Sequence, residues 1–211
     1  MNINQFTGRD GGSNIPPMEG GTFTAVCSGV VDLGTHTTEW NGEVKQRNQL
    51  LLMFDFPTET IEIQGKEMPR CLSIKLTKSQ HENSKFRQHI ISWRGRDFTQ
   101  DELDDFHMSK LLGVPATVSV IRKEVNGKKY ANISTIAKAI KGIDVKPTRK
   151  IYFDMSVSET YGAIEELPDW VICLINQSAE AIAHKWIFAK KASVIETANA
   201  VSATPEDDTP F

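Results

Sequence analysis

Residues 116–136 read ATVSVIRKEVNGKKYANISTI. This stretch predicts a β-hairpin, and it is the clearest structural signal in the sequence. Its centre is Asn126-Gly127, the strongest short hairpin signal, because both turn positions need positive φ and these residues tolerate it. The runs on either side are rich in β-branched residues, which favour strands. A two-residue turn pairs Val125 with Lys128, and this pairing predicts the register of the whole hairpin.

The predicted register gives the hairpin two different faces. It places Lys123 opposite Tyr130 and Val120 opposite Ile133. The apolar face, which is predicted to be core, carries Val118, Val120, Ala131 and Ile133. The other face mixes cations with an aromatic ring and carries Ile121, Lys123, Lys128 and Tyr130. Such a mixture is typical of surfaces that bind single-stranded nucleic acid, because phosphates attract cations and unpaired bases stack on aromatic rings.

Upstream of the hairpin, alternating and β-branched residues predict three more strands. The clearest is Gln46 to Phe56, where apolar residues alternate until a proline ends the pattern. The others are Thr22 to Val31, followed by a loop over residues 36–42, and Cys71 to Leu76, which returns from a short arm around Gln64-Gly65. The chain is therefore expected to begin as an antiparallel meander.

Three helices are predicted from their first turns. Ser79 and Glu82 form a capping-box pattern ahead of an apolar stripe, so a helix is expected from about Gln80 to Trp93. The same pattern begins again at Thr99 and predicts a second, short helix. Proline is favoured in the first turn of a helix, so a third helix is expected from Pro168 to about Ala189.

This order of elements predicts a mainly β protein with helical insertions, of the α+β class. Strands, two capped helices and a final hairpin have the order of the OB-fold, a five-stranded barrel, although other small barrels share it. We therefore expect an OB-fold-like barrel followed by a C-terminal helix and a disordered acidic tail. The predicted parts are a flexible arm over residues 1–21, the barrel over 22–150, a helical extension over 151–195 and the tail over 196–211.

Charge is sorted along the chain. The net charge is −3, but four acidic residues near the C-terminus leave the first 195 residues with a net charge of +1. Residues 66–96 carry a net charge of +6 and residues 115–150 a net charge of +7, which favours a polyanionic ligand. The residues predicted to bind DNA are Trp40, Lys45, Arg47, Arg70, Lys75, Lys78, Arg94, Arg96, Arg122, Lys123, Lys128, Lys129 and Tyr130.

The other aromatic residues divide between surface and core. Trp40 lies in a polar stretch and is predicted to stack on bases. Phe54, Phe56 and Trp93 belong to apolar patterns, so we expect them in the core.

No catalytic or metal-binding pattern stands out. The five histidines and three cysteines show no metal-ligand spacing, and no glycine-rich phosphate loop follows a strand. We therefore expect no enzyme activity, no cofactor and no metal, although a metal-dependent nuclease with dispersed carboxylates stays open. Cys27, Cys71 and Cys173 are expected to be core thiols in a reducing, cytoplasmic setting, because the sequence has neither a signal peptide nor a membrane-spanning run.

The last eight residues read TPEDDTPF and form an acidic end with an aromatic tip. Such a segment cannot bury enough apolar surface to fold alone. A carboxylate beside an aromatic ring suits a basic pocket with an apolar floor, so this end is predicted to be a ligand for a partner protein. The residues predicted to contact that partner are Glu206, Asp207, Asp208, Pro210 and Phe211.

Two parts of the chain resemble single-stranded DNA-binding proteins. The tail is similar to the acidic C-terminal peptide of the bacterial proteins of this class, which ends in Pro-Phe. Residues 21–141 resemble phage-encoded single-stranded DNA-binding proteins from replication modules. The stretches that carry this second resemblance are Ser92–Arg96, Phe98–Leu103, Leu111–Pro115 and Lys129–Ile133, with a weaker one at Leu167–Trp170.

The resemblance implies an OB-fold that coats single-stranded DNA with little sequence preference, in replication or recombination in the cytoplasm of a bacterial host. It also implies that the tail recruits replication or recombination proteins. Thr209 stands where bacterial tails usually have an apolar residue, which is expected to weaken docking to the usual pocket, and a long Gly/Gln-rich linker is absent. The ordered body is longer than the bacterial type, so a tetrameric assembly is not carried over. A strand-annealing recombination protein and a basic phage structural or adaptor protein remain alternatives.

Overall fold

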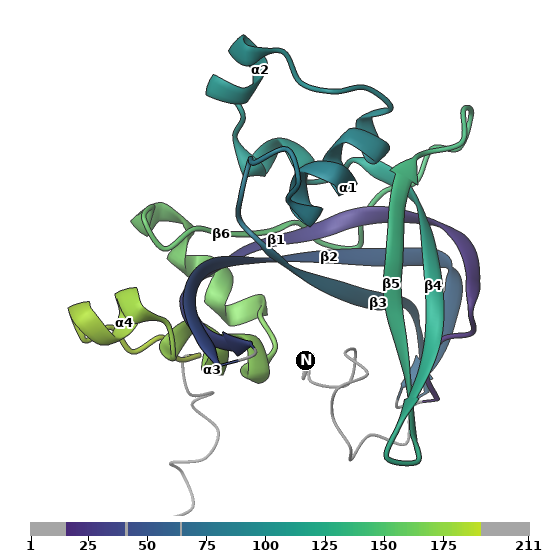
Figure 1. Ribbon diagram of the computed structural model, residues 1–211. Coiled ribbons are helices and arrows are strands. Elements are labelled where there is room, and N and C mark those ends of the chain that lie inside the picture. Colours follow the sequence, from purple (N-terminus) through teal and green to yellow (C-terminus); the bar gives the residue numbers. More distant parts are fainter. Residues whose placement is uncertain (1–15, 41, 64, 191–211) are drawn as a thin grey trace, which may run out of the picture.

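The computed structural model describes residues 16–40, 42–63 and 65–190, which form one curved sheet with helices on both faces (Figure 1). The predicted tail and the first 15 residues of the predicted arm lie outside the described residues. The strands are β1 (Gly21–Trp40), β2 (Glu43–Ile63), β3 (Lys66–Thr77), β4 (Pro115–Val125), β5 (Lys128–Lys138) and β6 (Ile151–Phe153). The helices are α1 (Lys85–Arg94), α2 (Gln100–Asp104), α3 (Asp169–Asn176) and α4 (Ala179–His184), with the 3-10 helices η2 (Met108–Leu111) and η3 (Ser158–Glu166).

The sheet has the strand order β3-β2-β1-β4-β5, with β6 beside β1. Pairs along this path are antiparallel, whereas β6 pairs with β1 in parallel. The sheet curves until its two end strands, β3 and β5, come into contact, but no hydrogen-bonded ladder joins them within the described ranges (Figure 1). A mainly β protein with helical insertions is thus confirmed. The expected five-stranded barrel is corrected to an open sheet of six strands. The sixth strand, β6, was not predicted because its three residues are too few to show an alternating pattern.

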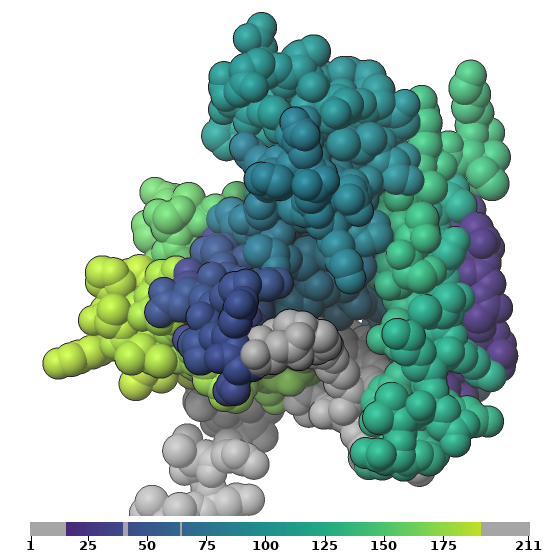
Figure 2. Space-filling model, viewed as in Figure 1, coloured from purple at the N-terminus to yellow at the C-terminus, as the bar shows by residue number. Residues whose placement is uncertain are grey.

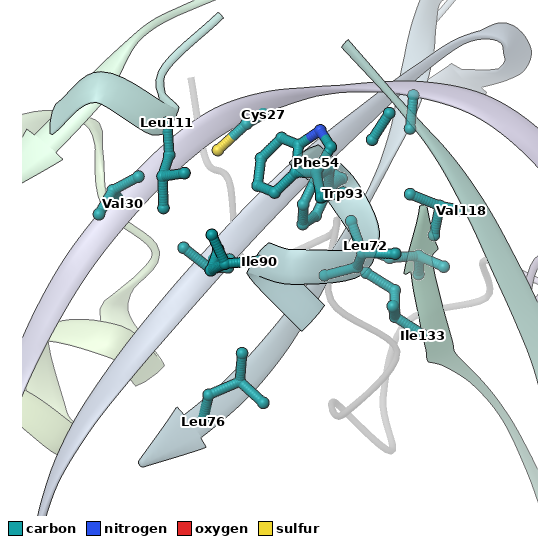
Figure 3. Close-up of a cluster of buried hydrophobic side chains, with 14 of the residues drawn as sticks. Cys27, Val30, Phe54, Leu72, Leu76, Ile90, Trp93, Leu111, Val118 and Ile133 are labelled. Atoms are coloured by element: carbon teal, nitrogen blue, oxygen red, sulfur yellow. The ribbon is translucent and has the colours of Figure 1, made fainter. Parts of the chain in front are cut away.

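Both faces of the sheet are buried, so the molecule has two cores. Along β2, Leu50, Leu52 and Phe54 belong to the first core. α1 covers this core with Ile90 and Trp93, which Figure 3 shows beside Phe54. Leu51 and Met53 alternate with the three β2 residues of the first core and point into the second core, because successive side chains of a strand face opposite sides. The second core is covered by β6, η3, α3 and α4.

The second core depends on a close approach at Gly34 of β1. Gly34 follows an irregularity in the β1–β2 ladder and has a φ of +75°. A Cβ atom added there would lie 2.6 Å from the Cβ of Ser178, the residue that caps α4. Beside it, the Glu180 carboxylate accepts the Thr35 N–H at 2.7 Å and the Thr35 hydroxyl at 2.6 Å. Glycine therefore lets α4 pack directly on the sheet.

The predicted hairpin is confirmed in its turn and register. Asn126 and Gly127 have φ values of 52° and 75°. The predicted partners are paired: Val125 with Lys128, Lys123 with Tyr130, and Val120 with Ile133. A register irregularity beyond Val120 was not predicted, because no glycine or proline marks it in the sequence.

Two predicted strand ends are wrong. β1 continues through the predicted loop at residues 36–42 as far as Trp40, because residues 35–40 pair with β2. β2 likewise continues beyond Pro57 to Ile63, after an irregularity in its pairing with β3. Both extensions lie beyond the two cores. The β1 extension is polar and shows no apolar alternation, whereas in β2 Pro57 interrupts the pattern ahead of the predicted arm at residues 61–63.

The first predicted helix start is also wrong. α1 begins at Lys85 because Ser84 is its cap: the Ser84 hydroxyl accepts the Arg87 N–H at 3.1 Å. The Ser79 hydroxyl instead accepts the N–H of His81 and forms a local turn.

The other two helix starts are confirmed, but the third helix is shorter than predicted. Thr99 forms the expected capping box of α2. α3 begins after Pro168 and ends at Asn176, and Ser178 then caps a separate helix, α4. Two short helices rather than one long one follow the curved outer surface of the sheet.

Residues 16–20, which the sequence assigns to a flexible arm, are held against the sheet. Met18 is 3% exposed and belongs to the first core. Arg122 donates to the carbonyls of Pro17 and Met18, and Arg70 donates to the carbonyl of Pro16. These contacts make this short segment part of the folded body.

Candidate nucleic-acid interface

A groove of about 300 Å³ lies where the curved sheet stays open, between β3 and the β4–β5 hairpin. β3 contributes Ser73 and Lys75, and the hairpin contributes Lys123 and Tyr130. Trp170 of α3 lines the same groove. The groove therefore combines three parts of the chain that are distant in sequence.

The sheet register explains why these side chains meet on the outer surface. Lys75 pairs with Leu51, whose side chain points away from the first core. Lys123 pairs with Tyr130 on the hairpin face opposite the buried Val120. These residues thus share the face that carries α3, and the hairpin tip stands out at the lower right of the space-filling view (Figure 2).

The groove offers positive charge and aromatic surface together. Lys75 and Lys123 are exposed, whereas the rings of Tyr130 and Trp170 are half-buried. No acidic residue is among the described residues that line the groove. Asn132 adds an amide, and the buried indole N–H of Trp170 has no hydrogen-bond partner among the described residues.

Four more of the predicted DNA-binding residues lie beside turns of the sheet. Lys128 and Lys129 are exposed next to the Asn126-Gly127 turn. Trp40 is the last residue of β1, and Lys45 follows at the start of β2, where its ammonium group pairs with Glu43. A fifth predicted residue, Arg47, is exposed further along β2 and lies outside the groove.

Two predicted arginines and one lysine are held in ion pairs away from the groove. The guanidinium groups of Arg94 and Arg96 both bind Glu102, and that of Arg94 lies 4.1 Å from the centre of the Phe98 ring. Lys78 binds the largely buried Asp32 at 2.7 Å. Arg70 and Arg122 also lie outside the groove, where they hold residues 16–19 as described above. Each of these five cations therefore has a hydrogen bond or an ion pair that stabilises the fold.

The predicted core aromatics are confirmed. Phe54 and Phe56 are fully buried, and Trp93 is 4% exposed. The indole N–H of Trp93 donates to the Pro115 carbonyl at 2.8 Å, which ties α1 to the start of β4. These rings are therefore not available to bases.

The cysteines divide into two kinds. Burial raises the pKa values of Cys27 and Cys71 to about 12, so both are core thiols as predicted. Cys173 is exposed on α3, and the prediction of a core thiol is wrong there, because this position faces outward from a helix only partly covered by the second core. No cluster of three or more metal-binding side chains is found within residues 16–40, 42–63 and 65–190. None of the described helices is long and apolar enough to cross a membrane.

Trp170 and Asn132 are groove residues that sequence reasoning did not single out. Asn132 follows directly from the confirmed register, because it lies two residues from Tyr130 on the same face. Trp170 lies in the first turn of a correctly predicted helix, but no local pattern shows that this helix packs beside the hairpin.

No protein-family model matches the chain, and no curated protein sequence matches it.

Proposed function

We propose that the protein binds single-stranded DNA, with little sequence preference, in the groove between β3 and the β4–β5 hairpin. The observation that carries this proposal is the meeting of two lysines with two aromatic rings, Lys75 and Lys123 with Tyr130 and Trp170, in a groove without described acidic lining residues. Lysines suit phosphates of any sequence, and every base has a flat face that can stack on a ring. Duplex DNA hides those faces inside the helix, so the aromatic rings favour a single strand.

The strand order supports the same proposal. In an OB-fold, β1 lies between β2 and β4, the end strands β3 and β5 approach each other, and a helix follows β3. The order β3-β2-β1-β4-β5, the contact between β3 and β5 and the position of α1 agree with that arrangement. We infer an open variant of the OB-fold.

In an OB-fold, the predicted DNA-binding residues beside the turns would lie next to the binding surface. OB-folds bind oligonucleotides on the face of strands 2 and 3 and with the loops that join strands 1–2 and 4–5. Trp40 and Lys45 lie next to the first of these loops, and Lys128 and Lys129 next to the second. The bound strand would then cross the outer face of β2 and β3 between the two loops.

The test is a titration of labelled oligothymidylate at two salt concentrations, with a duplex of equal length as the control. Binding should weaken with salt, with a slope in log–log form of about 0.7 for each phosphate contact. The single strand should bind more tightly than the duplex. Absence of binding at low salt, or equal affinity for the duplex, would overturn the proposal.

We further propose, from the sequence of the tail alone, that residues 206–211 recruit a replication or recombination protein. Phe211→Ala should abolish capture of such proteins and leave DNA affinity unchanged, because the tail and the groove have separate ligands. Capture that persists in the variant would contradict the role of the terminal ring.

A further inference from the structure

A second hollow, of about 470 Å³, lies at the far end of β3, beside the start of α1. Its cations come from three elements: Arg47 from β2, Lys75 from β3 and Lys85 from α1. Thr77 and His81 add polar groups, and no acidic residue is among its described lining residues. Lys75 also lines the groove described above, so the two hollows share a wall.

The sheet register places the strand residues Arg47, Lys75 and Thr77 of this hollow on the outer face that carries the groove, whereas Lys85 comes from α1 on the other face. Lys75 pairs with Leu51, and Thr77 pairs with Gln49. Arg47 is two residues further along β2 and therefore points to the same side as Leu51. At about 3.3 Å for each residue, Arg47 lies about 13 Å along β2 from Leu51. A ligand that reaches from the Leu51 end of the groove to Arg47 is therefore an extended chain rather than a small molecule.

The charge of this hollow differs from that of two other hollows among the described residues. Beneath α2, Arg94 and Lys110 line a hollow together with their ion-pair partners Glu102 and Asp105. Beside α4, Lys78 lines a hollow together with its partner Asp32. In both places the lining carries its own counter-charges.

Arg47 and Lys85, by contrast, have no acidic counter-charge beside them in the hollow. Both side chains are exposed, and neither forms an ion pair within the described residues. Two neighbouring cations without an ion-pair partner among the described residues repel each other, and a local feature of this kind is expected at a functional site. Tryptophan, tyrosine and phenylalanine are absent from the described lining, so the hollow suits phosphate rather than stacked bases.

We propose that the hollow at Arg47 and Lys85 is a second subsite that binds the phosphodiester backbone of the same single strand. The bases stack at Tyr130 and Trp170, and the backbone then passes Lys75 and continues along β3 to Arg47 and Lys85. This inference rests on the proposed function, because the second hollow supplies charge but no means of selecting a single strand.

The test compares two double variants on a series of oligothymidylates from about 4 to 16 nucleotides, the range of lengths that one OB-fold covers. The first is Arg47→Ala with Lys85→Ala. The control is Lys141→Ala with Lys146→Ala, which removes the same charge from exposed residues of the β5–β6 connection that line neither hollow. The measurements are the dissociation constant at each length and its dependence on salt.

The first variant should bind the shortest oligonucleotides as the unchanged protein does, because they fill only the groove. It should bind long ones about tenfold more weakly at about 50 mM salt, with a salt slope smaller by about 1.4 for the two lost contacts. The control variant should keep both the affinity and the slope. Lys85→Ala alone should show about half of the slope change, which provides the same test if the double variant is poorly folded.

The outcomes separate this inference from the proposed function. If the first variant matches the unchanged protein at every length, the second subsite is wrong while the groove stands. An equal loss at all lengths would also overturn it, because the hollow would then not be a separate subsite. If no oligonucleotide binds the unchanged protein at low salt, both proposals fail.

Discussion

Removal of the Tyr130 ring tests the groove most directly. Tyr130 is half-buried, lies opposite Lys123 on the hairpin and lines the groove together with Trp170. Tyr130→Ala deletes the ring but keeps the backbone pairing of β4 with β5, because ladder hydrogen bonds come from the main chain. The variant therefore removes a stacking surface without removing the hairpin.

The expected size of the effect follows from one lost stack. A base stacked on an aromatic ring contributes about 1–3 kcal/mol, so the dissociation constant for single-stranded DNA should rise roughly 5- to 150-fold. The loss of folding stability should be smaller, about 1 kcal/mol, because the ring is only half-buried and belongs to neither core. Affinity and stability should thus separate clearly.

Fluorescence anisotropy with a labelled oligothymidylate measures the affinity, and a thermal melt checks folding. Tyr130→Phe is the matched control: it keeps the ring and should bind within about twofold of the unchanged protein, since stacking needs the ring face and not the hydroxyl. If Tyr130→Ala also binds within twofold while melting normally, no base stacks on Tyr130 and the reasoning from the groove is refuted.

Three further predictions concern the fold. Gly34→Ala should lower the free energy of unfolding by about 3 kcal/mol or more in urea titrations, because alanine is strained at positive φ and its Cβ would collide with the cap of α4; an unchanged midpoint would contradict the close approach. Burial raises the pKa values of Cys27 and Cys71 to about 12, so at pH 8 a thiol reagent should label only Cys173 rapidly, and three rapid thiols would contradict the two cores. Hydrogen bonds from two arginines and a backbone N–H hold the pKa of Glu102 below its ordinary value of 4.5, so its contribution to stability is present above that value and is lost as the pH falls below it. Glu102→Gln should therefore flatten the fall in melting temperature between about pH 5 and pH 2, and an identical pH profile would argue against this contribution.

The sequence predicted best what is decided locally. The Asn126-Gly127 turn and the Thr99 capping box depend on residues within a few positions of each other, and both are confirmed. The failures occurred where long-range pairing extends an element, or where two neighbouring residues can both act as a helix cap. β1 and β2 pair with each other well beyond the cores, and Ser84 rather than Ser79 caps α1.

The candidate site shows the same division. Lys123 and Tyr130 could be placed on one face from the hairpin register alone. The arrival of Trp170 from α3 and of Lys85 from α1 could not, because no short pattern states which surface a helix will pack against. Nor could the ion pairs of Arg94, Arg96 and Lys78 with Glu102 and Asp32 be read from the sequence, because each depends on where distant or turn residues meet in the fold.

Because both faces of the sheet are buried, the segment before residue 151 is not expected to fold as a separate domain. Leu51 and Met53 project from the same strand as Leu52 and Phe54, but the segment from β6 to α4 is what covers them. In a fragment that stops at residue 150, those side chains, with Val31 and Leu33 of β1, would form an exposed apolar patch prone to aggregation. Such a fragment should aggregate on expression, and a protease that cuts in the β5–β6 connection should leave two pieces that stay together until the protein is denatured.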